Sequence, residues 1–141
     1  MIYYAVIDTN VLVSALLSSF PDAATVQVVG KMLDGEIIPL FSDEIMKEYN
    51  EVLRRKKFHF SEKNILMLLS VIEKYGEKIV PGPTDEILPD MKDLPFYEVV
   101  VEKQDDDAYL VTGNIKHFPK KPFIVTAKEF WILLVGNKCN C

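Results

Sequence analysis

The chain has 141 residues, of which 49% are hydrophobic, and its formal net charge at neutral pH is −5. This length is enough for one domain with its own core, and the apolar content excludes a disordered polyelectrolyte. The negative charge argues against a protein that coats nucleic acid electrostatically, although it does not exclude an enzyme that acts on nucleic acid.

Membrane and export segments are not expected. No apolar run approaches the roughly 18 residues that a membrane span needs. The start lacks the basic segment of a signal peptide, and Asp8 interrupts the first apolar stretch. We therefore expect a cytoplasmic protein with no membrane contact. Cys139 and Cys141 form a lone C-x-C pair, which is weak evidence for zinc and favours an exposed, reduced tail.

The amino-terminal half alternates strand and helix patterns. Its first apolar run is rich in β-branched and aromatic residues and is bounded by polar ones, which is typical of a buried parallel strand. Pro39 indicates that the second strand is brief or lies at a sheet edge, and Ser42 is a good helix N-cap. In chain order we expect a strand over 2–7, helices over 11–18 and 23–33, a strand over 37–41 and a helix from 42 to about 55.

The carboxyl-terminal half continues the alternation after a basic segment, 54–57. One helix begins at Ser61 and should place Ile65, Leu66, Leu68, Leu69 and Ile72 inside. Thr126 and Glu129 form a capping box for the last helix. In chain order we expect a helix over 61–75, a strand over 78–80, an acidic loop over 84–92, a helix over 93–101, a strand over 108–111, a polar loop over 116–121, a strand over 122–125 and a helix over 126–134.

This regular alternation predicts an α/β fold in which helices cover both faces of a central parallel sheet of about five strands. No internal repeat or interdomain linker is visible. We expect a single domain over residues 1–135 and a C-terminal tail over residues 136–141.

Carboxylates gather near one edge of this predicted sheet. Asp8 ends the first strand, Asn114 follows the fourth, and Asp93 begins the helix before the fourth. The carboxyl ends of parallel strands share one edge, where open α/β sheets build their sites. Glu48 borders the apolar face of its helix. Oxygen ligands from separate elements suit a hard cation such as Mg²⁺ or Mn²⁺, which could assist attack on a phosphodiester.

Each of these acids also has a plain structural interpretation. Asp8 and Asp93 could simply cap the helices that follow them, and Glu48 could be a flanking residue with its charge in water. The run of aspartates at 105–107 is interpreted as a solvated turn.

Four blocks of the sequence, in their order and spacing, resemble the PIN-domain ribonucleases, in particular the branch of toxin components of toxin–antitoxin systems. The blocks are V-I-D-T-N-V-L at 6–12, S-D-E-I-M-K-E-Y at 42–49, D-M-K-D-L-P-F at 90–96 and L-V-T-G-N-I-K-H-F at 110–118.

The resemblance implies a three-layer α/β/α fold and an endoribonuclease that depends on Mg²⁺ or Mn²⁺. It matches Asp8, Glu48 and Asp93 to the family's characteristic acids, which would hold the metal and carry catalysis. Asn10 matches a polar residue beside the first acid, and Thr112 matches the Ser/Thr that supports the site. It also implies an RNA substrate and an antitoxin partner. We further expect a homodimer.

The sequence departs from the family at Asn114, where many members carry a fourth acid. An amide can coordinate a metal through its carbonyl, but it brings no charge and cannot serve as a base. Asp90 could replace part of the missing charge, or it could be a solvated loop acid. The departure motivates a second hypothesis, a PIN-like module that binds RNA or protein with weak or no catalysis. A phosphatase is disfavoured because D-T-N lacks the second aspartate of a D-x-D motif.

Several cations are candidates for contact with RNA. Arg54 and Arg55 belong to a basic segment that precedes two phenylalanines, and this segment could grip phosphates or could be a charged helix end in water. Lys116 and His117 closely follow Asn114, so they could lie near the scissile phosphate, with His117 as a general acid.

Overall fold

The structure is a computed structural model that describes residues 2–138, so Cys139 and Cys141 lie outside the described residues. Its sheet has five strands, and every neighbouring pair is parallel. The strands are β1 (Tyr3–Ile7), β2 (Ile37–Phe41), β3 (Glu77–Lys78), β4 (Tyr109–Val111) and β5 (Ile124–Val125).

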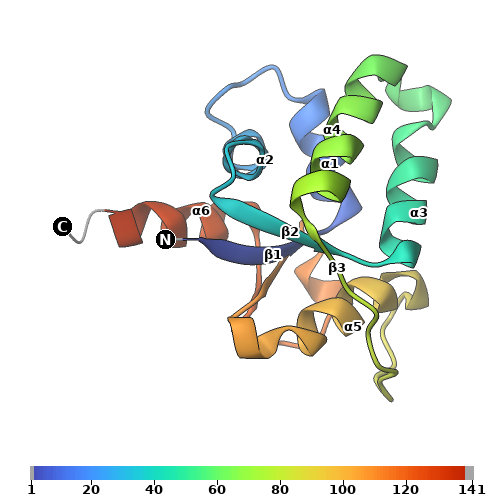
Figure 1. Cartoon of the computed structure of the whole chain (residues 1–141), viewed down its shortest axis with the longest axis vertical. Coiled ribbons are helices and arrows are strands. Elements are labelled where there is room, and N and C mark those ends of the chain that lie inside the picture. Colours follow the sequence, from blue (N-terminus) through green and yellow to red (C-terminus); the bar gives the residue numbers. More distant parts are fainter. Residues whose placement is uncertain (1, 139–141) are drawn as a thin grey trace.

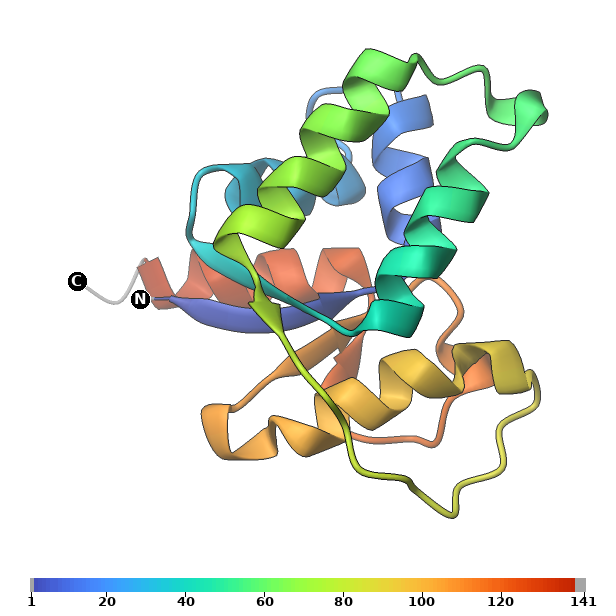
Figure 2. The same ribbon diagram turned by 45° about the vertical axis from the view of Figure 1, so that its right-hand side comes forward.

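Helices cover both faces of this sheet, which confirms the predicted α/β/α sandwich. The helix α5 lies on one face, and α1, α2 and α4 lie on the other (Figures 1 and 2). The helix α6 packs against α2, and α3 contacts both α1 and α5. The helices are α1 (Thr9–Leu17), α2 (Ala24–Leu33), α3 (Asp43–Leu53), α4 (Glu62–Tyr75), α5 (Leu94–Glu102) and α6 (Ala127–Lys138).

The strand order β3-β2-β1-β4-β5 makes β1 the central strand. From β1 the chain first winds outward through β2 to β3, and it then returns to the other side of β1 to form β4 and β5. The direction of winding therefore reverses between β1 and β4. Open parallel sheets build their sites at the carboxyl ends of the strands beside such a reversal.

The predicted helix starts are formed by the expected local contacts. The Ser42 hydroxyl accepts the backbone N–H of Ile45 at the start of α3. At the start of α6, the Glu129 N–H donates to Thr126 Oγ1 at 3.1 Å, and the Thr126 N–H donates to the Glu129 carboxylate at 2.9 Å. This reciprocal pair is the predicted capping box.

Pro39 indicated a brief strand or an edge strand, and the second alternative is wrong, because β2 pairs on both sides. Neighbouring residues of a parallel strand direct their backbone groups to opposite sides. The Phe41 carbonyl accepts the Ile79 N–H, so Pro39, two residues earlier, also faces the β3 side. There β3 begins to pair only opposite Leu40, and the missing N–H of Pro39 therefore costs the sheet no hydrogen bond.

Two further predictions from the apolar pattern were wrong. The third strand was expected over residues 78–80, but β3 ends at Lys78 and Val80 is 85% exposed. Leu66 was expected inside α4, but it is 51% exposed. Leu66 lies one residue after Ile65 and two before Leu68, both buried, and helical periodicity turns it away from the core. No helix within residues 2–138 is long and apolar enough to cross a membrane.

A glycine at the end of α4 allows β3 to approach β2. A Cβ atom on Gly76 would lie 2.3 Å from the Ile72 carbonyl oxygen and 2.5 Å from the Pro39 carbonyl oxygen. Both contacts are with backbone atoms, so neither can be relieved by rotating a side chain. Gly30, inside α2, has no atom within 4 Å of the same position.

We therefore predict that Gly76→Ala lowers the free energy of unfolding by about 1 to 3 kcal/mol, as overpacking does. The matched control Gly30→Ala should raise it by about 0.5 to 1 kcal/mol, because alanine favours the helical backbone. Urea denaturation of both variants measures the difference. Equal stability of the two variants would contradict the close packing of Gly76 against Pro39.

Candidate functional site

Asp8 lies at the carboxyl end of the central strand and is 4% exposed. It occupies the N-cap position of α1, yet its side chain makes no capping hydrogen bond. Its backbone N–H donates instead to the carbonyl of Val111 at 2.9 Å, which continues the pairing of β1 with β4. Asp8 therefore does more than begin the next helix, because it also extends the pairing of β1 with β4.

The Asp8 carboxylate is held by side chains from its own turn and from the end of β4. Thr112 Oγ1 donates to Asp8 Oδ2 at 2.6 Å, and Asn10 Nδ2 donates to the same oxygen at 3.3 Å. Burial raises the pKa of Asp8, the hydrogen bond from Thr112 lowers it, and the charge of Asp93 raises it again. The backbone N–H groups of Thr9 and Asn10 also lower it, and the net direction is upward. The site thus keeps a buried carboxylate at a high electrostatic cost.

Thr112 also organises the loop that carries Asn114. The Asn114 N–H donates to Thr112 Oγ1 at 2.9 Å, and the Gly113 N–H donates to Asn10 Oδ1 at 3.1 Å. The residues after β4 are thereby tied to the residues after β1. The Asn114 side chain is exposed and makes no hydrogen bond to any residue within 2–138. Asn114 therefore lies at the predicted edge with its amide available.

Glu48 is half-buried on α3 and accepts a hydrogen bond from the hydroxyl of Thr9. Burial raises the pKa of Glu48, the hydrogen bond from Thr9 lowers it, and the nearby charge of Asp8 raises it. The direction overall is upward. Glu48 is thus not a flank residue with its charge in water, because its carboxylate is held by the turn that follows Asp8.

Two residues beside the site were missed by the sequence interpretation. Thr9 orients Glu48 as described, and the hydroxyl of the buried Tyr49 donates to the carbonyl of Ile7. Thr9 lies inside the D-T-N block, and Tyr49 lies on the predicted apolar face of α3. Their polar partners depend on the packing of α3 against β1 and α1, which no local pattern reveals.

Asp93 precedes α5 and likewise makes no capping hydrogen bond through its side chain. His117 Nδ1 lies 3.0 Å from Asp93 Oδ2, and the Asp93 side chain is 17% exposed. Burial raises the pKa of Asp93, the contact with His117 lowers it, and the charges of Asp90 and Glu48 raise it; the net direction is upward. The structure thus pairs Asp93 with a histidine from the loop after β4.

The negative charges of the three predicted acids raise one another's pKa. The charge of Asp93 raises the pKa of Asp8, the charge of Asp8 raises that of Glu48, and the charge of Glu48 raises that of Asp93. The charge of Asp90 raises the pKa of both Glu48 and Asp93, whereas the charge of Arg55 lowers the pKa of Glu48. Clusters whose members raise one another's pKa are typical of functional sites.

The carboxylates of the site suit a divalent cation, but they lie too far apart to surround one. Within residues 2–138, no three His, Cys, Asp or Glu side chains come close enough to form a metal-binding group. The chemistry of Asp8, Glu48 and Asp93 nevertheless fits Mg²⁺ or Mn²⁺, which prefer carboxylate oxygens. A cation would relieve the mutual repulsion of these acids, and it would have to draw their side chains together.

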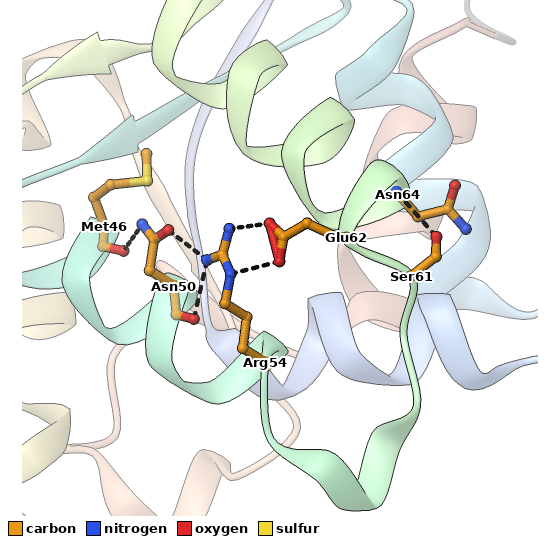
Figure 3. A network of polar contacts seen from close by, with 6 residues as sticks. All are labelled: Met46, Asn50, Arg54, Ser61, Glu62 and Asn64. Atoms are coloured by element: carbon orange, nitrogen blue, oxygen red, sulfur yellow. Dashed lines mark hydrogen bonds and ion pairs between the residues drawn. The ribbon is translucent and has the colours of Figure 1, made fainter.

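The predicted RNA-contacting cations differ in how they are engaged. The Arg54 guanidinium donates to both oxygens of Glu62, at 2.9 and 2.7 Å, and also to the Asn50 side chain at 2.7 Å. Figure 3 shows this network joining the end of α3 to the start of α4. It occupies Arg54 with a structural role. Arg55 and Lys116 are exposed. The charge of Arg55 lowers the pKa of Glu48.

A family model described as PIN domain matches residues 4–116, which include Asp8, Glu48, Asp93 and Asn114. The chain belongs to the PIN domain family. Comparisons with curated proteins and with solved structures gave no match. PIN domains are typically metal-dependent nucleases, and PIN nucleases act on RNA, so membership suggests a nuclease. The matched segment contains the site residues that follow β1 and also those that follow β4, including Thr112.

The raised pKa of Asp8 predicts a stability cost. An acid whose pKa is higher in the folded state than in the unfolded state destabilises the fold wherever it is ionised. We predict that Asp8→Asn, which keeps an oxygen to accept the Thr112 hydroxyl, raises the free energy of unfolding by about 1 kcal/mol at neutral pH. Urea denaturation in a chelating buffer measures this difference.

The sign of the pH dependence gives a second readout. The destabilisation by ionised Asp8 is present above the raised pKa of Asp8. It is lost as the pH falls through that pKa, because Asp8 in the unchanged chain is then neutral, as the asparagine of the variant is. The stability advantage of Asp8→Asn should therefore narrow in acid. A variant less stable than the unchanged chain at neutral pH would contradict the electrostatic picture.

Proposed function

We propose that this PIN domain is an endoribonuclease that depends on Mg²⁺ or Mn²⁺. The observation that carries the proposal is the state of Asp8, which is buried at the end of the central strand and held by Thr112. Both acids occupy cap positions, but each is also engaged from another element, Asp8 by Thr112 and Asp93 by His117. Acids that are costly to bury are expected where catalysis needs them.

Asp8, Glu48 and Asp93 would hold the ion, which would supply positive charge against the scissile phosphodiester. Thr112 fixes the Asp8 carboxylate, and the Thr9 hydroxyl fixes that of Glu48. These contacts limit the rotation of both acids and preorganise the negative edge. Asn114 would contribute a neutral ligand or a hydrogen bond to the substrate, because an amide cannot take up a proton.

His117 is the candidate proton donor. An ionised carboxylate can only accept a hydrogen bond, so contact with ionised Asp93 places a proton on Nδ1 of His117. The His117 side chain is 43% exposed, and no residue within 2–138 hydrogen-bonds to Nε2. When Nε2 is also protonated, it can give a proton to the leaving oxygen of the substrate.

The test is cleavage of single-stranded RNA in the presence of Mn²⁺ or Mg²⁺. We predict that Asp8→Asn lowers kcat/KM by about 100-fold or more, because one charge of the metal site is lost. The matched control is Asp105→Asn, since Asp105 is an exposed aspartate outside the site, and it should retain full activity. Equal cleavage by Asp8→Asn and the unchanged chain would refute the assignment of Asp8.

A second candidate function is favoured by Asn114 and by the open arrangement of the acids. In this alternative the domain binds RNA or a protein partner with weak or no catalysis. Calorimetric titration with Mn²⁺ separates the two. We predict that Asn114→Asp tightens Mn²⁺ binding about tenfold by adding a charge to the ligand set. No heat of binding at millimolar Mn²⁺ for either form would favour the binding module.

We also propose that the chain is one PIN domain that acts as the toxin of a toxin–antitoxin pair and forms a homodimer. The first part is supported by the resemblance of its four blocks to that branch. The helix α6 passes residue 135 and continues to Lys138. It exposes the apolar side chains Ile132 and Val135, which supports a dimer. Induced expression without growth arrest would count against a toxin, and a monomeric sedimentation coefficient would count against a dimer.

A further inference from the structure

A cleft of about 420 Å³ lies beside the acidic edge, on the β4 and β5 side. It is formed where α1, the start of α2, the loop after β4 and the start of α6 meet. Its polar lining is Asn10, Ser14, Thr25, Asn114, Thr126 and Lys128. A larger cleft of about 570 Å³ lies near Tyr4 and Tyr109, and its lining contains no predicted site residue.

Four of the polar side chains in the cleft next to Asp8 are not used by the fold. The hydroxyls of Ser14 and Thr25, the amide of Asn114 and the ammonium of Lys128 make no hydrogen bond or ion pair within residues 2–138. Hydrogen-bonding groups that gather in one concave place without partners of their own are typical of a ligand site.

Asn10 connects this cleft to the catalytic acids. Its Nδ2 donates to Asp8 Oδ2 at 3.3 Å, and its Oδ1 accepts the Gly113 N–H at 3.1 Å. Both ends of the amide are therefore committed, and Asn10 both contacts Asp8 and lines the cleft. The cleft is thus adjacent to the acids.

The chemistry of the lining selects the ligand. Lys128 supplies a cation in a chain whose net charge is −5, and the two hydroxyls with the amide match a sugar hydroxyl and a base edge. The lining contains no aromatic side chain, and its apolar members are only Val11, Ala24 and Ala127. It therefore lacks the large anchors of a protein interface.

We propose that this cleft binds the nucleotide next to the scissile phosphodiester of single-stranded RNA, with Lys128 on the backbone phosphate. The proposal rests on the proposed nuclease function and extends it by naming where the substrate lies beyond the acids. Recognition here is by hydrogen bonds and charge, since no ring is available for stacking.

The test measures binding of a short, fluorescein-labelled single-stranded RNA of mixed sequence by fluorescence anisotropy. The protein carries Asp8→Asn, which is expected to slow cleavage. In this background Lys128→Ala should weaken binding about fivefold and should reduce the slope of log K against log salt by about 0.7, the loss of one phosphate contact. Lys120→Ala is the matched control, because Lys120 is also exposed but does not line the cleft. It should change neither quantity.

The possible results distinguish the proposed RNA-binding cleft from the proposed nuclease function. Equal affinity and equal salt slope for Lys128→Ala and Lys120→Ala would refute RNA binding in the cleft, whether or not the chain cleaves RNA. If the unchanged chain cleaves no RNA but Lys128→Ala still weakens binding, the nuclease function is refuted and RNA binding in the cleft is supported. If the chain does cleave, Lys128→Ala should raise KM and leave kcat unchanged, because the contact is made before and during reaction alike. A lower kcat at constant KM would contradict a binding role.

Discussion

The structure depends on one constraint, the burial of a charged carboxylate at the end of its central strand. Asp8 is almost fully covered, and the ionised form would be untenable without donors aimed at it. Thr112 provides the shortest of these contacts, from the neighbouring strand. The pairing of β1 with β4 is what brings the two together. The strand order of the sheet thus determines the chemistry of the site, because it places the Thr112 hydroxyl next to Asp8.

Each acid of the site is supported by a different element. Asp8 is held from the end of β4, Glu48 from the first turn of α1, and Asp93 from the loop that follows β4. Asp8 also accepts a hydrogen bond from Asn10 in the helix that it begins. The α3 helix is further fixed to β1 through the hydroxyl of Tyr49. Because the supports cross between elements, a shift of any one helix would disturb more than one carboxylate.

The features that local chemistry determines could be predicted from the sequence. The apolar run before Asp8 indicated the central strand, and Ser42 and Thr126 marked two helix starts. Long-range features could not be predicted. Pro39 is tolerated inside the sheet because β3 begins beyond it, and Arg54 is taken up by Glu62 across a loop. The alternation of strands and helices indicated that the acids share an edge, but not which hydroxyl or imidazole holds each of them.

The contact between Thr112 and Asp8 joins residues 104 positions apart in the chain. A ribosome releases Asp8 and Glu48 early, but the donor that holds Asp8 emerges only after β4 has been made. Domains generally fold as units during synthesis, so a nascent chain lacks a finished site until most of the domain is outside the exit tunnel. Under the proposed ribonuclease function, this delay would protect the message that is being translated.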